Sequence, residues 1–307
     1  MIKNVKTLIA GSGNTTGINI IRCLKDRHIN VLGMDYAEIN PANKFCKNFI
    51  VPNCSDPNYF SFVFDIIKKH KITHIFTSND HDTRILSEKI EILKKENVIL
   101  NGYGVNTINF LNKSKTTELF QINEILTPEF VHSDTDFPYV LRKNDMGNEK
   151  KFVYMINSED KKKEIPLLHY EKGIKTRFID GYEYTIDILC DNISNILSVV
   201  PRLRREVRFG MVYIGEIVYN KELISKSKEL SKKLKLTGVN CVQCIENDKN
   251  FYFTEVNPRP GSGLDLTIKA GVNMPLIWIQ SSIGKPIDIP EPKWGLKMVR
   301  YYDAFFF

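Results

Sequence analysis

The sequence lacks several features that would place it in particular protein classes. No apolar run is long enough to cross a membrane, and the short apolar run near the amino end passes into a glycine-rich turn, so neither a membrane span nor a secretory signal is expected. The six cysteines have no disulfide-framework spacing. Cys241 and Cys244 are three apart in a predicted strand and therefore point to opposite faces, so we interpret both as packing residues. These absences favour a globular protein of the reducing cytoplasm.

The chain also lacks a concentrated basic surface pattern and the motifs of nucleophilic catalysis. Its formal net charge is +7, but no basic stripe alternates with aromatic residues, so a nucleic-acid partner is not expected. No GxSxG elbow or catalytic-cysteine signature occurs, so no covalent protein nucleophile is expected. With 307 residues, 42% hydrophobic and 26% charged, the composition is that of a globular chain of two or three compact units.

The amino-terminal third has the pattern of a doubly wound α/β unit. Residues 5–10 form a buried-strand run, a glycine-rich turn follows at 11–17, and a helical pattern and a second strand lead to Asp35. The GxGxxxG spacing departs from the dinucleotide pattern, so the turn is either a plain tight turn or an anion site for a carboxylate or phosphate. An NAD-dependent oxidoreductase would depend on this turn alone.

A second candidate region follows the predicted strand at 74–77. Asp80, His81 and Asp82 come directly after its carboxyl end, where α/β sheets place ligands. Contact with a substrate and an ordinary polar loop are both open interpretations. The periodicity predicts that a helix at 83–96 follows.

A predicted β-hairpin near the carboxyl end carries the clearest chemical signal. Two strand patterns joined by a turn at residues 247–248 bring Gln243 opposite Glu255. Glu255 and Asn257 are two apart, so their side chains leave the same face of the strand. Converging carboxylate and amide oxygens suit Mg²⁺, and Arg259 offers guanidinium donors to phosphate or carboxylate. The hairpin therefore predicts a phosphate-handling metal site, although an exposed strand edge with solvated charges would show the same pattern.

The order of motifs in this region is similar to that of a known superfamily. With GxxxVQ at 238–243, a hairpin, and ExNPR at 255–259, the chain resembles the ATP-grasp superfamily, in particular the branch similar to the ATP-binding domains of carbamoyl-phosphate synthase. The resemblance implies that the Gln, Glu and Asn oxygens of the hairpin hold Mg²⁺ and that Arg259 contacts the transferred phosphate. It covers nearly the whole chain and is strongest from residue 113 to residue 275.

The same resemblance assigns nucleotide-binding roles to the middle of the chain. Lys113, at the start of a predicted helix, falls on the family's ATP-phosphate lysine, with Lys115 as a register alternative. Arg142, on a predicted strand, takes the place of a second lysine of the family and can donate two hydrogen bonds to phosphate oxygens. The family covers the phosphates with a glycine-rich loop, and the matching residues 144–151 retain only Gly147.

A further segment matches the family's adenine hinge and the motif GxEYTxD. The resemblance implies that the backbone of Arg177, Phe178 and Ile179 meets the adenine edge and that Glu183 accepts from the ribose hydroxyls. The pattern alone indicates a surface β-hairpin, and the two interpretations are compatible.

Four arginines lie between residues 202 and 208. If the strand is regular, Arg202, Arg204 and Arg208 share a face, where unpaired like charges either favour an anion or remain solvated. A similar segment of the ATP-grasp branch lies near the γ-phosphate and the acceptor. Arg204, together with Arg142 and Arg259, is therefore predicted to be catalytic.

These observations predict an α/β chain with a mixed α+β second part. A doubly wound parallel domain is expected at 1–107, followed by an ATP-grasp domain with a small subdomain at 108–180 and a large one at 181–285. The aromatic tail at 286–307 is expected to pack on the body or on a neighbouring subunit, as in a homodimer.

The expected function is that of an ATP- and Mg²⁺-dependent ligase. It would activate a small-molecule carboxylate as an acyl phosphate for attack by an amine or ammonia, with charge stabilisation by positioned cations. The glycine-poor loop at 144–151 leaves a second hypothesis, a nucleotide-binding protein without catalysis.

Overall fold

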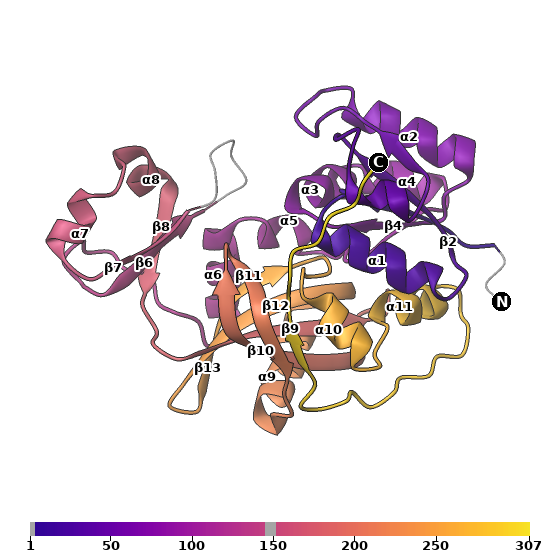
Figure 1. Ribbon diagram of the computed structural model, residues 1–307. Helices are drawn as coiled ribbons and strands as arrows, with labels where there is room; N and C mark the ends of the chain where they lie inside the picture. Colours follow the sequence, from indigo (N-terminus) through magenta and orange to yellow (C-terminus); the bar gives the residue numbers. More distant parts are fainter. Residues whose placement is uncertain (1–3, 145–151) are drawn as a thin grey trace.

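The computed structural model of the protein describes residues 4–144 and 152–307, and these residues form three β-sheets (Figure 1). The amino-terminal sheet has five parallel strands in the order β3-β2-β1-β4-β5. Its elements in chain order are β1 (Lys6–Ala10), α1 (Thr15–Lys25), β2 (Asn30–Asp35), the 3-10 helix η1 (Pro41–Lys44), β3 (Asn48–Ile50), α2 (Tyr59–His70), β4 (His74–Thr77), α3 (Asp80–Glu88), α4 (Ile90–Lys95) and β5 (Ile99–Leu100).

Both faces of this sheet are covered, which confirms the predicted doubly wound arrangement. Leu8 and Ala10 of β1 belong to a core cluster with residues of α2, α3 and α4. Ile9, between them, belongs to a different cluster that includes residues of α1. The two clusters lie on opposite faces because successive strand side chains alternate.

The region after β4 differs from the expected loop and single helix. The Asn79 side chain accepts a hydrogen bond of 2.9 Å from the Asp82 backbone N–H and caps α3. Asp80, His81 and Asp82 are therefore the first turn of a helix. The predicted helix at 83–96 is two helices, α3 and α4, which meet at Lys89.

The small sheet is antiparallel, has the order β7-β6-β8, and projects from the rest of the molecule in Figure 1. It has a core of its own, which includes Tyr139, Leu141, Phe152 and Ile156. Its elements are β6 (Tyr139–Lys143), β7 (Val153–Ile156), α7 (Glu159–Lys163), α8 (Leu167–Lys172) and β8 (Gly173–Arg177).

The large sheet has six strands in the order β13-β12-β9-β10-β11-β14. Phe120 of α6 packs in its core, although this helix lies within the predicted small subdomain at 108–180. The predicted domain boundaries stay a prediction. The elements of this part are α5 (Thr107–Phe110), α6 (Lys113–Ile122), β9 (Tyr182–Cys190), β10 (Ile196–Arg208), β11 (Met211–Ile217), α9 (Lys221–Leu234), β12 (Gly238–Asn247), β13 (Asn250–Asn257), α10 (Leu264–Lys269), α11 (Met274–Ser282) and β14 (Lys297–Val299).

The carboxyl tail packs on the body of the chain up to β14, whereas Phe306 and Phe307 at its aromatic end are largely exposed, so the expected packing is met only in part. The tail contributes β14, which pairs antiparallel with β11. Beyond β14, Phe305 contacts Phe45 of the amino-terminal unit in an edge arrangement, with ring centroids 5.5 Å apart. Tyr301, Tyr302 and Phe306 remain largely exposed.

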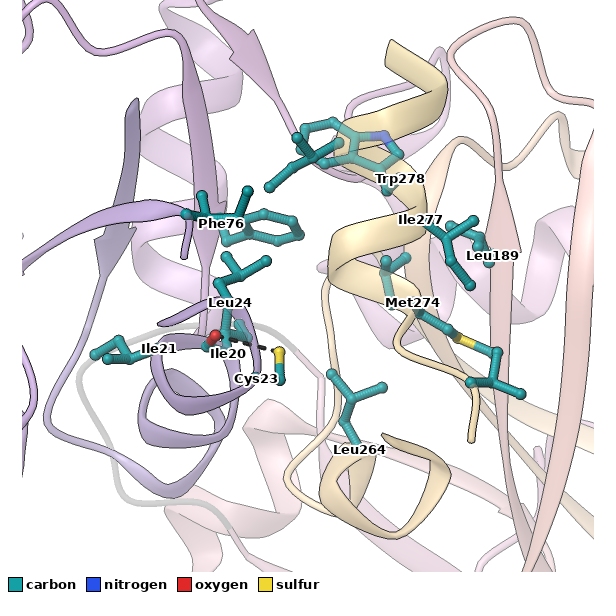
Figure 2. Close-up of a cluster of buried hydrophobic side chains, with 14 of the residues drawn as sticks. Ile20, Ile21, Cys23, Leu24, Phe76, Leu189, Leu264, Met274, Ile277 and Trp278 are labelled. Carbon is teal, nitrogen blue, oxygen red and sulfur yellow. Dashed lines mark hydrogen bonds between the residues drawn. The ribbon is translucent and has the colours of Figure 1, made fainter. Parts of the chain in front are cut away.

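The amino-terminal and large sheets share one hydrophobic cluster, part of which is drawn in Figure 2. Trp278 of α11 contacts Phe76 of β4, with ring centroids 4.9 Å apart, and Leu189 of β9 belongs to the same cluster. The Trp278 indole N–H donates to Asn192 Oδ1 at 3.1 Å, so its polar atom is satisfied. The two parts are therefore joined by packed side chains as well as by the chain itself.

Candidate active site

The hairpin of β12 and β13 sets the three predicted metal ligands close together. In this antiparallel pair Gln243 lies opposite Glu255, and Cys241 lies opposite Asn257. Gln243 and Glu255 are half-buried, and Asn257 is buried. The expected hairpin is confirmed, whereas metal binding by these residues stays a prediction.

Each predicted metal ligand contacts a cation that the sequence analysis assigned to phosphate. The oxygens that would bind a metal and the cations that would bind phosphates are therefore partners of one another. The three contacts are Lys113 Nζ to Glu255 Oε1 at 2.5 Å, Arg204 Nη1 to Gln243 Oε1 at 3.4 Å, and Arg259 Nη2 to Asn257 Oδ1 at 3.3 Å.

Lys113 is held at the first position of α6. The Asn112 side chain caps this helix, and Asn144 Oδ1 accepts from both the backbone N–H and the hydroxyl of Ser114 at 2.8 Å. Lys115, the register alternative, is exposed, whereas Lys113 reaches the hairpin. The geometry therefore favours Lys113 over Lys115 as the lysine of the site.

Arg142 enters the same region from the small sheet. Its Nη1 donates to the carbonyl of Thr254 in β13 at 3.2 Å, next to Glu255 in the chain. Its Nε is buried and has no hydrogen-bond partner among residues 4–144 and 152–307. Burial lowers the pKa of the Arg142 guanidinium, and nearby Glu255 opposes this shift. A buried donor without a partner is costly, so the Nε–H is suited to donate a hydrogen bond to an oxygen of a ligand.

The predicted adenine segment begins at Arg177, the last residue of β8. The backbone N–H of Arg177 donates to the Glu129 carbonyl at 2.9 Å, so this amide is used within the protein. The Arg177 side chain points outward and lies 3.8 Å from the Glu129 carboxylate. Phe178 and Ile179 are half-buried.

Glu183, the predicted ribose acceptor, is half-exposed at the start of β9. Its Oε2 lies 3.1 Å from Arg204 Nη1, the guanidinium that also contacts Gln243. The structure thus links the predicted ribose acceptor to the arginine strand, which the sequence pattern did not anticipate. Nothing in the motif spacing marks this contact, because it joins two neighbouring strands at a register that depends on their pairing.

The arginine strand β10 does not carry unpaired charges, and the expectation of unpaired like charges was wrong. Arg202 is 2% exposed and donates from Nε and Nη2 to the Asp187 carboxylate at 2.8 Å each. Burial alone would lower the pKa of Arg202, but Asp187 more than offsets this and raises it. Bulges around Glu206 break the regular alternation. The four ion pairs are Arg202 with Asp187, Arg204 with Glu183, Arg205 with Glu216, and Arg208 with Glu206.

Asp80 reaches the site from the amino-terminal unit. Its Oδ1 accepts from Arg259 Nε at 2.6 Å, and both side chains are mostly buried. Asp82, two residues on, instead points inward and accepts from the Tyr59 hydroxyl at 2.5 Å. The interpretation as a polar loop is therefore wrong. Asp80 is connected to the site by its bond to Arg259, and contact with a substrate stays a prediction.

The glycine-rich turn of the amino-terminal unit is filled by its own side chains. The Gly13 N–H donates to Asp35 Oδ2 at 2.9 Å, and a Cβ added at Gly13 would lie 2.9 Å from Asn40 Cβ. The Ser12 hydroxyl donates to Asn48 Oδ1 at 2.6 Å. The Gly13 N–H is therefore already bonded to a carboxylate of the protein and is not available to an anion in this structure.

The two cysteines of β12 are packing residues, as predicted. Cys241 and Cys244 are buried free thiols, and burial raises the pKa of Cys241 to about 11. The described residues contain no group of three or more His, Cys, Asp or Glu side chains that could hold a metal. No helix in the described part of the chain is long and apolar enough to span a membrane. The glycine-poor loop lies, except for Asn144, outside the described residues.

Two surface cavities lie away from the predicted ligands. One of about 160 Å³ lies between α9, β13 and residues 124–126, which follow α6, and one of about 370 Å³ lies between α1, α10 and β14. Neither is lined by a residue assigned to the site, so the candidate site depends on side-chain geometry rather than on cavity size.

Known proteins resemble the chain in sequence and in fold. Residues 7–100 match the family described as PylC-like, N-terminal domain, and residues 171–304 match the family described as ATP-grasp in the biosynthetic pathway with Ter operon. A D-alanine–D-alanine ligase of Fusobacterium nucleatum subsp. nucleatum is 24% identical over 165 residues, which are 49% of this chain and 57% of that protein. The chain thus spans a little over half of this relative.

Two solved structures extend the likeness to the whole fold. N5-carboxyaminoimidazole synthetase from Staphylococcus aureus, complexed with ADP, has a TM-score of 0.76 at 16% identity, over 97% of this chain and 82% of that one. L-amino acid ligase from Bacillus licheniformis has a TM-score of 0.71 at 19% identity, over 92% and 75%. The matches therefore identify an ATP-grasp family over residues 171–304, and over the whole chain they show the fold of these solved structures.

Proposed function

We propose that the protein is an ATP- and Mg²⁺-dependent ligase that activates a small-molecule carboxylate as an acyl phosphate and joins it to an amine or ammonia. The observation that carries this proposal is the pairing of three oxygen ligands with three cations along β12 and β13. Such a set suits a metal–triphosphate complex, in which oxygens face the metal and cations face the phosphates.

The donor set fits Mg²⁺. Glu255 supplies a carboxylate, and Gln243 and Asn257 supply amide oxygens, all of which are hard ligands. When bound, the ion would neutralise phosphate charge and favour transfer of the phosphoryl group. Lys113, now paired with Glu255, would be released to a phosphate oxygen once the carboxylate has a metal partner.

The other cations would position and stabilise the transferred group. Arg142 offers its buried Nε, and Arg204 lies beside Gln243 with its side chain 11% exposed. Arg259 lies two residues beyond the end of β13, close to Asn257. Fixed donors of this kind stabilise charge that develops during phosphoryl transfer, without reorganisation at the moment of reaction. The amine would then attack the acyl carbon and displace inorganic phosphate to give the amide, with no protein nucleophile.

Two of the similar proteins are named as ligases that join amino acids, which supports an amide-forming reaction. We therefore expect the acid and the amine to be small molecules. The adenine would lie near Arg177, Phe178 and Ile179, with Glu183 near the ribose.

The test is a thermal-shift titration followed by a product screen. ATP with Mg²⁺ should raise the melting temperature, whereas NAD should not. ADP release should then appear with a subset of acid and amine pairs. Binding of ATP with Mg²⁺, but no ADP release with any pair, would favour the second hypothesis, a nucleotide-binding protein whose glycine-poor loop at 144–151 does not support catalysis. No binding at all would refute both.

A further inference from the structure

The contact between Asp80 and Arg259 joins two distant parts of the chain at the candidate site. The two residues are 179 positions apart, and Asp80 Oδ1 lies 2.6 Å from Arg259 Nε. Their side chains are 20% and 13% exposed, so water screens the pair only in part. A charge-assisted hydrogen bond of this length, partly shielded from water, is among the stronger polar contacts in proteins.

The Arg259 guanidinium is held on all three of its nitrogens. Besides the bond to Asp80, Nη2 donates to Asn257 Oδ1 at 3.3 Å and Nη1 donates to the Pro260 carbonyl at 3.3 Å. Of these three acceptors only Asp80 is charged. Asp80 therefore both fixes the orientation of the guanidinium and offsets its positive charge.

Asp80 is in turn held by the packing of the amino-terminal unit. Asn79 caps α3 through the Asp82 N–H, and its side-chain amide donates to Asp82 Oδ2 at 2.6 Å. Asp82 is 6% exposed and accepts from Tyr59 of α2. The first turn of α3 is thus fixed to α2, and Asp80 is presented to Arg259 from a rigid element.

We propose that Asp80 is a positioning residue that holds the Arg259 guanidinium in place for phosphoryl transfer and offsets its positive charge in the ground state. This inference rests on the proposed function. Without the Asp80 carboxylate the guanidinium keeps its charge but loses its orientation. The uncompensated charge attracts the anionic nucleotide more strongly, while the loss of orientation reduces stabilisation of the transition state.

The experiment measures binding of the ATP analogue AMP-PNP with Mg²⁺ by calorimetry, in wild type and in three variants. In Asp80→Asn we expect binding that is unchanged or up to about tenfold tighter. In Arg259→Gln we expect binding about tenfold weaker. If Asp80 acts through Arg259, the double variant should bind like Arg259→Gln. Weaker binding in Arg259→Gln together with no weakening in Asp80→Asn is the signature of this role.

A purely structural ion pair gives a different result. Removal of either partner would then loosen the contact between the amino-terminal unit and residue 259, and both single variants would bind AMP-PNP more weakly. That result would overturn the proposal. Glu96→Gln is the matched control, since it removes a carboxylate paired with Lys68 elsewhere in the same unit, and it should leave binding unchanged. Arg259→Lys, which keeps the charge, replaces Arg259→Gln if the latter does not fold.

The second measurement is the steady-state rate of ADP release with an acid and amine pair that the enzyme accepts. Asp80→Asn should lower kcat about ten- to hundredfold with an unchanged or lower KM for ATP, and Asp80→Glu should restore part of kcat. An unchanged kcat, or a raised KM at constant kcat, contradicts the positioning role. Failure of the wild type to bind AMP-PNP would instead refute the proposed function, and the inference with it.

Discussion

Replacement of Glu255 by Gln should uncouple ATP binding from Mg²⁺. In the structure Lys113 Nζ lies 2.5 Å from Glu255 Oε1, with side-chain exposures of 22% and 16%. Without a metal, ATP must take Lys113 from this carboxylate and place its phosphates beside a negative charge. Two like charges about 6 Å apart, at an effective dielectric constant of about 20, repel by about 3 kcal/mol, and screening by salt reduces this to about 1.5 kcal/mol.

Glu255→Gln removes that repulsion and frees Lys113, so ATP without metal should bind about tenfold more tightly than to wild type. The variant also loses the single carboxylate of the predicted ligand set, so Mg²⁺ should no longer strengthen binding, and ADP release should fall at least about hundredfold. The assay is calorimetric titration of ATP in the presence of a chelator and in the presence of Mg²⁺.

A matched control lies on the same hairpin. Glu246 of β12 accepts a hydrogen bond of 2.7 Å from the Tyr184 hydroxyl and contacts none of the predicted phosphate cations in the described part of the chain. Glu246→Gln should therefore keep the wild-type Mg²⁺ dependence. If Glu255→Gln binds metal-free ATP no more tightly than wild type, or retains the Mg²⁺ effect, the assignment of Glu255 is wrong.

Three further predictions concern stability. Burial lowers the pKa of His74 from 6.5 to about 4, so as pH falls the imidazole is protonated in the unfolded chain before it is protonated in the folded one. Between these pH values the free energy of unfolding should fall by up to about 3 kcal/mol. Urea unfolding at pH 7.5 and pH 5 should therefore show a smaller pH dependence for His74→Gln than for wild type. Asp187→Asn leaves the buried Arg202 without its counter-charge and should cost about 3–5 kcal/mol of the free energy of unfolding in the same assay; a cost below about 1 kcal/mol would contradict this. Trp278→Ala opens a cavity in the cluster of Figure 2 and should also cost about 3–5 kcal/mol, read from the urea midpoint at constant m-value.

Much of the fold could be predicted from the sequence because the signals are local. The strand and hairpin patterns around Gln243 and Glu255 have period two, and the turn between them is short, so their pairing follows from neighbouring residues. The alternating βα pattern of the first third predicts a parallel sheet for the same reason. Both fold expectations are confirmed, whereas the roles of the residues stay predictions.

The remaining features depend on contacts between distant residues. The Asp187 partner of Arg202 and the Asp80 partner of Arg259 become neighbours only when strands pair and the units pack. Local pattern also missed the start of α3, since a cap by Asn79 outweighed the loop-like composition of the residues that follow. A contact between a motif arginine and an acid outside the motif leaves no trace in the spacing of either.

The shared hydrophobic cluster restricts how the molecule can move. The amino-terminal and large sheets meet through packed side chains such as Phe76, Trp278 and Leu189, and a hinge there would have to separate a close-packed interior. The small sheet has a separate core and projects from the body in Figure 1, so its rotation breaks far fewer apolar contacts. For the proposed nucleotide-binding function, opening and closing should therefore be a motion of the small sheet, while the part that carries Asp80 and Arg259 stays in place.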